Sequence, residues 1–218
     1  MTVKFVHISG GVTLLGGGAV AAEDLQSALT IAPRLIAADG GGDRALELGT
    51  VPEAVIGDMD SLSAAARARL AGRIHEIAEQ DSTDFGKCLT HVRAEFYLAL
   101  GFTGLRLDHT LATLNEVAQR AGQRILLIGE EDVIFRAPEA LAIDLPIGAR
   151  FSIFPFGRVE GRSEGLRWPI DGLELTPDGR VGTSNEVAGA VRLWLRGPAL
   201  ILLPKPHLPA ALSALGLR

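Results

Sequence analysis

The sequence contains a single cysteine, Cys88, among 218 residues, so the chain cannot form an internal disulfide. Such cysteine usage is typical of proteins in a reducing compartment. Met1 is followed by a short mixed run instead of basic residues and a long apolar stretch, as a signal peptide would require. No apolar run approaches the ~20 residues of a membrane helix. We therefore expect a soluble, cytoplasmic protein with no membrane partner.

The chain also lacks a block of basic residues. Its 21 Lys and Arg residues are outnumbered by 26 Asp and Glu residues, which leaves a net charge of −5. This balance argues against nucleic acid as a partner. An acidic protein that binds a phosphorylated ligand needs a metal ion or a few well-placed cations to hold it.

Two common phosphate-binding motifs are missing as well. The three glycines at 16–18 are not followed by the Gly-Lys-Ser/Thr of a P-loop, and they do not form a G-x-G-x-x-G motif. Two readings of this run remain open. It is either a plain turn that uses the conformational freedom of glycine, or a loop whose backbone amides face a phosphate.

Hydrophobic residues make up 47% of the chain, which is enough for a large core. In the first part, short β-like runs alternate with helical stretches of about ten residues, the pattern of βαβ units. The runs are residues 3–8, 34–38, 53–57, 73–78, 96–100 and 124–128. We predict an α/β fold that begins with a Rossmann-like, mainly parallel sheet with helices.

The pattern changes after about residue 132. Short β-like runs separated by Gly, Pro and Asp then follow one another, with no helical period until the last few residues, which predicts an antiparallel β-sandwich. They include residues 150–156, 165–170, 171–176, 190–196 and 199–204. We therefore expect two domains, residues 1–135 and residues 136–218.

Acidic residues recur where β-like runs end or helices begin, at Asp39, Asp58, Asp60, Asp81, Asp84 and Asp108. Any one of them is explained by a helix cap or a turn. In an open α/β sheet, however, the strand ends meet at the ligand-binding edge. Carboxylates gathered there favour Mg²⁺, which is completed by substrate phosphates. Asp58 and Asp60 are two residues apart, so one turn can direct both toward the same cation.

Several other residues have two readings each. Arg106 either grips a phosphate or pairs with Asp108, and Lys87 is either a phosphate-binding cation or a solvated helix lysine. His109 is either a general base or a structural hydrogen-bonding group at a helix start. Trp168 and the polar run 183–186 are either a core aromatic and a turn, or parts of a pocket for a heterocyclic small molecule.

Read in order, five motifs resemble the thiamine pyrophosphokinase (thiamine diphosphokinase) family. They are DGG at 39–41, GDMDS at 57–61, QDSTDFGKCL at 80–89, G-x-R-x-DH at 104–109 and TSNE at 183–186. The resemblance covers about residues 36–205. It implies a transferase of thiamine metabolism that moves the pyrophosphoryl group of ATP to the hydroxyl of thiamine, giving thiamine diphosphate and AMP. It also implies a Mg²⁺ cofactor.

The resemblance further implies an N-terminal catalytic domain that binds ATP and Mg²⁺ and a C-terminal domain that binds thiamine. The family pattern is a homodimer with active sites at the subunit interface. Two positions depart from the family pattern. Gly86 stands where a larger, often polar or acidic residue is common, and Leu105 stands where the loop often has a second glycine. The shape of the nucleotide pocket therefore does not follow from the resemblance.

Roles can be carried over position by position. The implied catalytic residues are Asp58, Asp60 and Asp84, and the implied metal ligands are Asp39, Asp58 and Asp60. The implied nucleotide-binding residues are Asp39, Gly40, Gly41, Gln80, Asp81, Lys87, Arg106 and Asp108. The implied thiamine-binding residues are Trp168, Ser184 and Asn185. The group that accepts the proton of the thiamine hydroxyl is either Asp84 or Asp58.

Two alternative functions remain compatible with parts of the sequence. Asp58-Met59-Asp60 alone also fits a nucleotide-sugar transferase of the DxD type, although the QDSTDF and RLDH segments have no place in that reading. A non-catalytic sensor of nucleotide or thiamine would retain the same cleft. Tight binding without product formation would distinguish the sensor from the enzyme.

Overall fold

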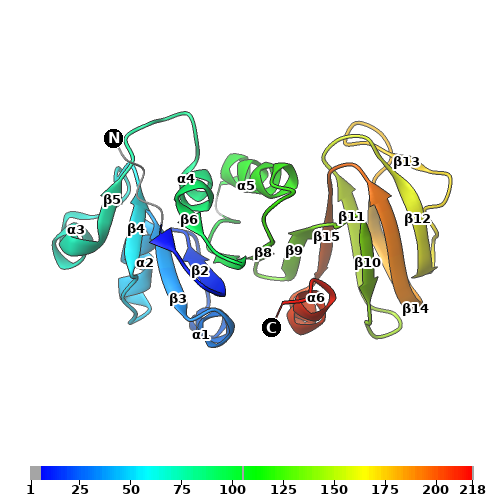
Figure 1. The fold of residues 1–218 in the computed structure, drawn as a ribbon, viewed down its shortest axis with the longest axis horizontal. Helices are drawn as coiled ribbons and strands as arrows, with labels where there is room; N and C mark the ends of the chain where they lie inside the picture. Colours follow the sequence, from blue (N-terminus) through cyan, green and yellow to red (C-terminus); the bar gives the residue numbers. More distant parts are fainter. Residues whose placement is uncertain (1–5, 105, 218) are drawn as a thin grey trace. The chain divides into compact units, whose positions relative to one another are not determined.

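The computed structural model describes residues 6–104 and 106–217, which form a mixed α/β fold (Figure 1). The chain divides into two compact units. The first comprises Met1–Glu116 and Leu127–Gly129, and the second comprises Val117–Leu126 and Glu130–Arg218. Among the described residues, no helix has both the length and the apolar character needed to span a membrane.

The first unit contains a parallel sheet. Its strands lie in the order β5 (Ile74–Glu76), β4 (Ala54–Gly57), β3 (Arg34–Ala38), β2 (Gly11–Leu15) and β7 (Phe96–Leu100). Every one of these neighbouring pairs is parallel. A separate parallel pair joins β1 (Val6–His7) to β6 (Val92–Arg93). The alternation of runs in the sequence correctly indicated parallel pairing here.

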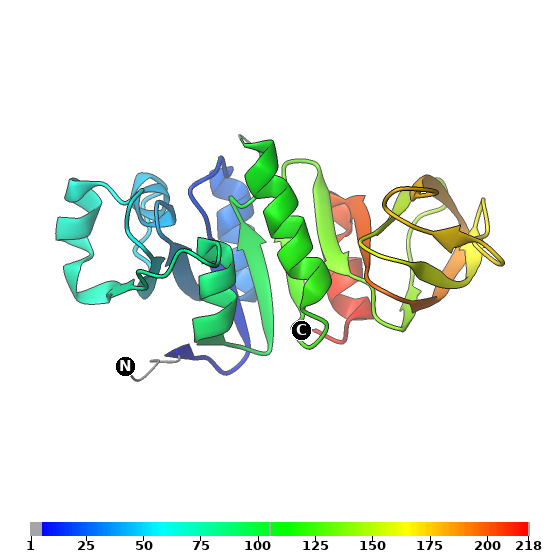
Figure 2. The same ribbon diagram turned by 90° about the horizontal axis from the view of Figure 1, so that it is seen from above.

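The helices of this unit connect the strands in two directions. The first three, α1 (Ala22–Ile31), α2 (Gly41–Glu47) and α3 (Ala64–Arg69), lead from β2 outward to β5, with a 3₁₀ turn at Ala71–Arg73. Helix α4 (Asp84–His91) then leads back to β7 on the other side of β2. Helices α1 and α4 lie on opposite faces of the sheet, as Figure 2 shows. Right-handed connections that leave a strand in opposite directions have this effect. The direction reverses between β2 and β7, where open α/β sheets bind ligands.

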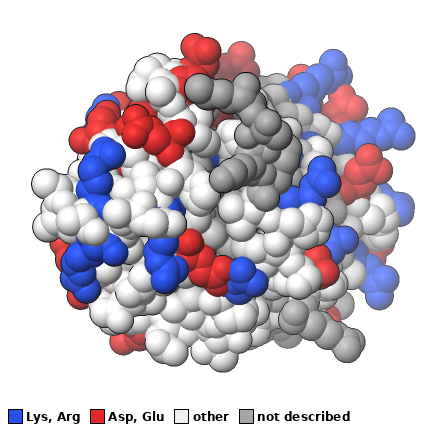
Figure 3. Space-filling view, turned by 60° about the vertical axis from the view of Figure 1, so that its left-hand side comes forward, with Lys and Arg blue, Asp and Glu red and all other residues white. Residues whose placement is uncertain are grey.

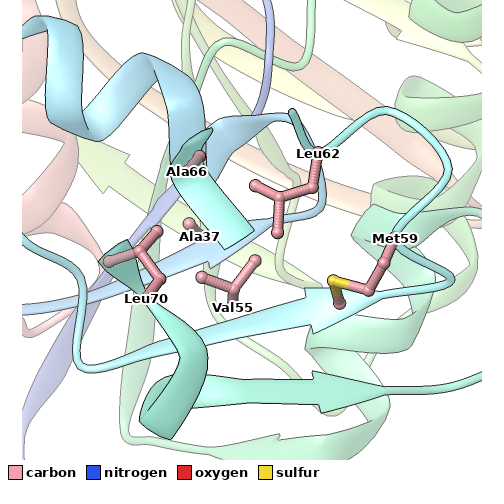
Figure 4. Close-up of a cluster of buried hydrophobic side chains, with 6 residues drawn as sticks. All are labelled: Ala37, Val55, Met59, Leu62, Ala66 and Leu70. Atoms are coloured by element: carbon pink, nitrogen blue, oxygen red, sulfur yellow. The ribbon is translucent and has the colours of Figure 1, made fainter. Parts of the chain in front are cut away.

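A cluster of buried side chains holds α3 against the sheet (Figure 4). Its members are Ala37, Val55, Met59, Leu62, Ala66 and Leu70. Ser63 caps α3 by accepting a hydrogen bond from the Ala66 N–H at 3.1 Å. Met59 is 3% exposed although it lies between two acidic residues. Its side chain therefore anchors the loop after β4 to the core and fixes the carboxylates on either side.

The second unit is built from antiparallel pairs. The strands run in the order β9 (Asp132–Arg136), β15 (Ala199–Pro204), β11 (Arg150–Pro155), β14 (Gly182–Arg196), β12 (Val159–Leu166) and β13 (Glu174–Leu175). Strand β10 (Ala140–Ile143) also pairs with β14. A 3₁₀ turn at Lys205–His207 and α6 (Leu208–Ala214) follow β15. The remaining elements of the described residues are α5 (Leu107–Gln119) and β8 (Ile125–Ile128).

The first predicted strand was confirmed in part, and a second strand close to it was missed. Of the predicted run 3–8, the structure describes a strand only at Val6–His7, and residues 3–5 lie outside the described residues. The central strand is β2, Gly11–Leu15, which was not predicted. Glycines flank this run on both sides, and they favoured a loop. In the sheet, β2 is buried by two neighbouring strands, a tertiary effect that outweighs local propensity.

Two predictions in the second unit were also wrong. Residues 165–170 do not form a strand beyond Leu166, because β12 ends there and its polar alternation at Val159–Leu166 was overlooked. The reading of residues 183–186 as a turn was wrong, because they lie inside the 15-residue strand β14. Ser184 has a φ of 59°, and the pairing of β11 with β14 shifts register beside it, as in a β-bulge.

Candidate active site

The loops after β3 and β4 bring Asp39, Asp58 and Asp60 together. One carboxylate oxygen of each lies within 4.8 Å of the others. Asp39 is buried, Asp58 is half-buried and Asp60 is exposed. Three carboxylates at this spacing repel one another unless a cation neutralises them. These are the three metal ligands that the resemblance implied.

The backbone at this cluster adopts left-handed conformations in residues other than glycine. Asp39 has a φ of 41° and Met59 a φ of 67°. Such conformations are costly and often occur at functional sites. Local hydrogen bonds hold the loop, from the Ser61 N–H to Asp39 Oδ2 at 3.0 Å and from the Asp60 N–H to Asp58 Oδ1 at 3.2 Å. The carboxylates are therefore positioned before any ligand binds.

Asp39 has an unusual environment for a carboxylate. Its Oδ1 atom is buried and has no hydrogen-bond partner among the described residues. Burial raises the pKa of Asp39 to about 6, despite the opposing hydrogen bond from the Ser61 N–H. An oxygen-only donor set with an unpartnered buried oxygen fits a hard divalent cation such as Mg²⁺.

Lys87 is the buried cation of the site. Its side chain is 2% exposed, and Nζ lies 3.1 Å from Asp84 Oδ1 and 3.3 Å from Asp58 Oδ2. Burial lowers the pKa of Lys87, but the hydrogen bonds and charges of Asp84 and Asp58 outweigh that effect and leave it raised. The reading of Lys87 as a solvated helix lysine was therefore wrong. It bridges the loop after β4 and the start of α4.

Gln80 and Lys87 both hold Asp58 in its ionised form. Gln80 Nε2 donates to Asp58 Oδ2 at 2.9 Å. Burial acts to raise the pKa of Asp58, but hydrogen bonds from the Asp60 N–H, Gln80 and Lys87 lower it overall. Because both Asp58 oxygens already accept hydrogen bonds, Asp58 is a weak base.

A cavity of about 390 Å³ opens beside these groups in the first unit. Two glycine loops form part of its wall, at 16–18 after β2 and at 101–104 after β7. They touch through hydrogen bonds from the Gly16 N–H to Leu100 O at 2.8 Å and from the Gly18 N–H to Gly101 O at 2.9 Å. A side-chain carbon at Gly16 would lie 2.4 Å from Gly101 O, so only glycine allows this approach. The cavity therefore lies at the switch point between β2 and β7.

Most of the predicted nucleotide residues of the first unit lie at this cavity. Those that line it are Asp39, Gly40, Gln80, Lys87 and Arg106, and the predicted catalytic residues Asp58 and Asp84 line it too. Gly41 is buried behind the lining, where an added Cβ would lie 2.0 Å from Leu15 O. Asp60, Asp81 and Asp108 are exposed and are not among the lining residues described. Asp60 still contributes to the metal-type cluster.

Arg106 and Asp108 form an exposed ion pair. Arg106 Nη2 lies 2.5 Å from Asp108 Oδ2 and Nε lies 3.1 Å from Oδ1. The hydrogen bond and charge of Asp108 raise the pKa of Arg106, and Arg106 lowers the pKa of Asp108. Asp108 thus orients a guanidinium that lines the cavity. Leu105, one of the two departures from the family pattern, lies outside the described residues.

Several residues that line the cavity were not expected from the sequence, namely Ser61, Ser82, Thr83, Phe85, Phe102, Thr103, Gly104 and Thr113. His109 and the glycines at 16–18, for which two readings were open, also line it. Phe85 and Phe102 pack with ring centroids 4.4 Å apart and join α4 to the loop after β7. Gly86 sits behind them, and an added Cβ there would lie 2.9 Å from Glu116 Oε1. Glu116 of α5 therefore occupies the space where a larger residue at 86 would extend.

Glu79 organises the loop that carries Gln80. Its carboxylate accepts hydrogen bonds from the Asp81 N–H at 2.8 Å and the Ser82 N–H at 3.1 Å, and also from Ser82 Oγ. The Ser82 side chain is the main cause that lowers the pKa of Glu79. Neither Glu79 nor this role was anticipated from the sequence.

We expect Glu79→Ala to speed amide hydrogen exchange at Asp81 and Ser82, because their N–H groups lose the carboxylate that accepts from them. In the wild type, the pKa of Glu79 is lowered in the folded state. The stabilisation of the loop by the Glu79 carboxylate is therefore fully present above the ordinary glutamate pKa of about 4.3. It should be lost as the pH falls through the folded-state pKa. Glu23→Gln, on an exposed position of α1, is the control. Unchanged amide hydrogen exchange at Asp81 and Ser82 in Glu79→Ala would contradict this role of Glu79.

The second unit contains a separate cavity of about 340 Å³. Trp168, Thr183, Asn185 and Arg180 line it together with apolar residues. Trp168 is 54% exposed and is not a core aromatic. Ser184 is exposed and is not among the described lining residues. Of the three predicted thiamine residues, two therefore meet at one cavity, and Thr183 joins them.

Charges of both signs are spread over the protein surface. On the face shown in Figure 3, Lys and Arg side chains lie among Asp and Glu side chains. Ion pairs between exposed side chains include Arg158 with Glu160 and Glu174 and Arg67 with Glu76. The cavity in the first unit differs, because its cations and carboxylates converge on one enclosed space.

Comparison with known families gives two matches. Residues 25–127 match the model described as thiamin pyrophosphokinase, catalytic domain. Residues 142–195 match thiamin pyrophosphokinase, vitamin B1 binding domain. Together the two matches cover more than half of the chain.

Individual relatives agree with this result. Thiamine pyrophosphokinase 1 of Oryza sativa subsp. japonica is 27% identical over 156 residues, covering 62% of this chain and 59% of the relative. Thiamine pyrophosphokinase 1 of Arabidopsis thaliana is 28% identical over 156 residues, covering 62% and 58%. The match thus spans less than two thirds of these curated relatives.

Solved structures share the fold. The thiamin pyrophosphokinase from Candida albicans superposes with a TM-score of 0.76 at 16% identity, covering 92% of this chain and 93% of that chain. The one from Geobacillus thermodenitrificans gives 0.72 at 20% identity, covering 89% and 96%. With both domain models matched in order and the fold shared, the chain belongs to the thiamine pyrophosphokinase family.

Proposed function

We propose that this protein is a thiamine pyrophosphokinase, which transfers the pyrophosphoryl group of ATP to the hydroxyl of thiamine and releases AMP. One observation carries the proposal. The carboxylates of Asp39, Asp58 and Asp60 and the buried ammonium of Lys87 converge beside one cavity at the strand ends. Phosphoryl-type transfer needs mainly positioning and charge neutralisation, and this site offers both.

Asp39, Asp58 and Asp60 would hold Mg²⁺, and the unpartnered Oδ1 of Asp39 supports this assignment. When bound, Mg²⁺ supplies positive charge to the phosphates of ATP. The protein itself offers Arg106 and the glycine loops at the cavity wall. A guanidinium binds phosphate oxygens in a bidentate manner, and loop amides bind anions. Gln80 and Lys87 keep Asp58 ionised and in place.

Asp84 is the better of the two candidates for the proton acceptor. Asp58 has both oxygens engaged, and its pKa is lowered, so it attracts a proton weakly. Asp84 is 33% exposed and lines the cavity, and its Oδ1 accepts from Lys87. A carboxylate placed beside the thiamine hydroxyl takes its proton as that oxygen attacks the β-phosphorus.

Thiamine recognition belongs to the second unit in this proposal, which agrees with the vitamin B1 binding domain matched at residues 142–195. Trp168 offers an aromatic face for a heterocycle, and Thr183 offers a hydroxyl group at the same cavity, which Asn185 also lines. Ser184 keeps an expected role from the resemblance alone. Because thiamine is a cation, the acidic groups of the active site also suit it.

We extend the proposal to the architecture of the whole protein. A Rossmann-like catalytic domain would occupy residues 1–135 and a thiamine-binding β-sandwich residues 136–218. The family resemblance supports a cytoplasmic homodimer whose active sites lie at the subunit interface. Sedimentation velocity tests the dimer. A stable species near the 23.0 kDa of one chain at micromolar concentration would contradict it.

The test of the function is a turnover assay with ATP, Mg²⁺ and thiamine, in which nucleotides and thiamine phosphates are separated by chromatography. Equal amounts of AMP and thiamine diphosphate are expected. ADP with thiamine monophosphate would instead place the attack at the γ-phosphorus. Absence of any product, with thiamine still raising the melting temperature, would indicate a sensor and overturn the proposal.

A further inference from the structure

The segment 167–171, which contains Trp168, is held by hydrogen bonds to strands on both sides. The Arg167 N–H donates to Glu186 O of β14 at 2.9 Å. On the β12 side, the Ile170 N–H donates to Ser163 Oγ at 3.0 Å, and the Ser163 N–H donates to Asp171 Oδ2 at 3.1 Å. An irregular segment held at both ends is a rigid support for the aromatic ring that it presents.

The side chain of Asn185 forms hydrogen bonds with this segment. Its Oδ1 accepts from the Trp168 N–H at 3.2 Å and from the Glu186 N–H at 2.8 Å, and its Nδ2 donates to Trp168 O at 2.7 Å. A side-chain amide has two acceptor sites and two N–H groups. Both acceptor sites and one N–H are thus used on the backbone. The buried Asn185 side chain holds Trp168 from both its peptide groups.

An ion pair braces the ring itself. The Arg167 guanidinium lies 5.0 Å from the ring centroid of Trp168, within cation–π range. Arg167 Nη1 lies 3.2 and 3.3 Å from the carboxylate oxygens of Glu186. Arg167 is not among the described residues that line the cavity, whereas Trp168 is. The guanidinium therefore supports the ring without occupying the cavity, and Glu186 neutralises its charge.

We propose that Asn185 and the Arg167–Glu186 pair are positioning residues, which hold the Trp168 ring as a platform for the heterocycle of thiamine. This inference rests on the proposed function. Asn185 acts through Trp168 and not through contact with thiamine. Glu186 has a second effect, because it cancels a positive charge next to a platform that receives a cationic ligand.

The test uses a Trp194→Phe background, in which Trp168 is the only tryptophan of the chain. Asn185→Ala, Arg167→Gln, Glu186→Gln and the double variant Arg167→Gln/Glu186→Gln are compared there. The matched control, Arg162→Ala, is made in the wild type, where Arg162 lies 4.0 Å over the ring of Trp194. Readouts are kcat, the KM values for thiamine and ATP, and acrylamide quenching of tryptophan emission.

We expect Asn185→Ala to raise the KM for thiamine about tenfold, with kcat and the KM for ATP nearly unchanged, since one buried hydrogen-bonding group is lost. Trp168 should become more accessible to acrylamide. Glu186→Gln should raise the KM for thiamine more than Arg167→Gln does. The double variant should recover part of that loss, because no charge is left uncompensated. Arg162→Ala should change none of the kinetic constants.

Two results would overturn the inference. One is a raised KM for thiamine in Asn185→Ala with unaltered Trp168 quenching, which would indicate direct contact with the ligand. The other is an unaltered KM in all these variants. If Asn185→Ala does not fold, as judged by circular dichroism, Asn185→Asp decides, since it keeps the oxygen acceptors but loses the donor to Trp168 O.

Failure of the proposed function is distinguishable from failure of this inference. The wild type is assayed first, and absence of AMP and thiamine diphosphate refutes the function alone. In that case, the affinity for thiamine is measured by adding thiamine and following the Trp168 emission. This affinity then replaces the KM for thiamine in every comparison above. No thiamine-dependent change in that emission would refute the platform as well.

Discussion

Replacing Asp60 by asparagine is expected to abolish turnover while the fold stays intact. The change removes one negative charge from the cluster of Asp39, Asp58 and Asp60, whose ligand oxygens lie within 4.8 Å of one another. Loss of a metal-binding charge at a phosphoryl-type transfer site should lower kcat/KM by about a thousandfold or more. Asparagine retains Oδ1, the atom that accepts the hydrogen bond from Ser61 Oγ at 2.9 Å. The loop should therefore keep its conformation.

The measurement is the AMP-producing assay over a range of Mg²⁺ concentrations, together with thermal unfolding. Asp178→Asn, an exposed position in the second unit, is the matched control and should retain full activity. A melting temperature close to that of the wild type would separate the chemical defect from a folding defect. Near-normal turnover of Asp60→Asn would refute the assignment of Asp60 as a metal ligand.

Replacing Lys87 by methionine is expected to inactivate the protein and also to destabilise it. Methionine has a similar length but no charge, so Asp58 and Asp84 lose the ammonium that lies 3.3 and 3.1 Å away. Removing one partner of a buried charge network costs about 3 kcal/mol, reduced here because Asp84 is partly exposed. Urea unfolding measures the free energy of unfolding, and the turnover assay measures activity.

A second substitution tests whether the charges are the cause. In Lys87→Met/Asp84→Asn, one of the two uncompensated carboxylates is gone, so part of the lost stability should return. Asp84→Asn alone should cost less than Lys87→Met, because Lys87 keeps Asp58. If the double variant is as unstable as the sum of the two single variants, the three groups do not act as a network.

The sequence alone determined the acidic character of the candidate active site. Its acidic residues fall at strand ends, and local signals of this kind depend only on neighbours along the chain. The parallel and antiparallel halves were also readable, since alternation with helices and closely spaced short runs are local patterns. The family followed from the order of the motifs.

Other features depended on contacts between distant residues. The strand at Gly11–Leu15 is central because β3 and β7 bury it, although its flanking glycines favoured a loop. Asn185 holds Trp168 across 17 residues of sequence, which no local pattern reveals.

The position of Lys87 shows the same limit most clearly. On its helix it reads as a solvated lysine, but the loop after β4, 29 residues away in sequence, places Asp58 beside its ammonium. The sequence specified which groups can carry charge. Only the tertiary structure decided which charges are buried together, because burial and pairing depend on segments that meet only when the chain folds.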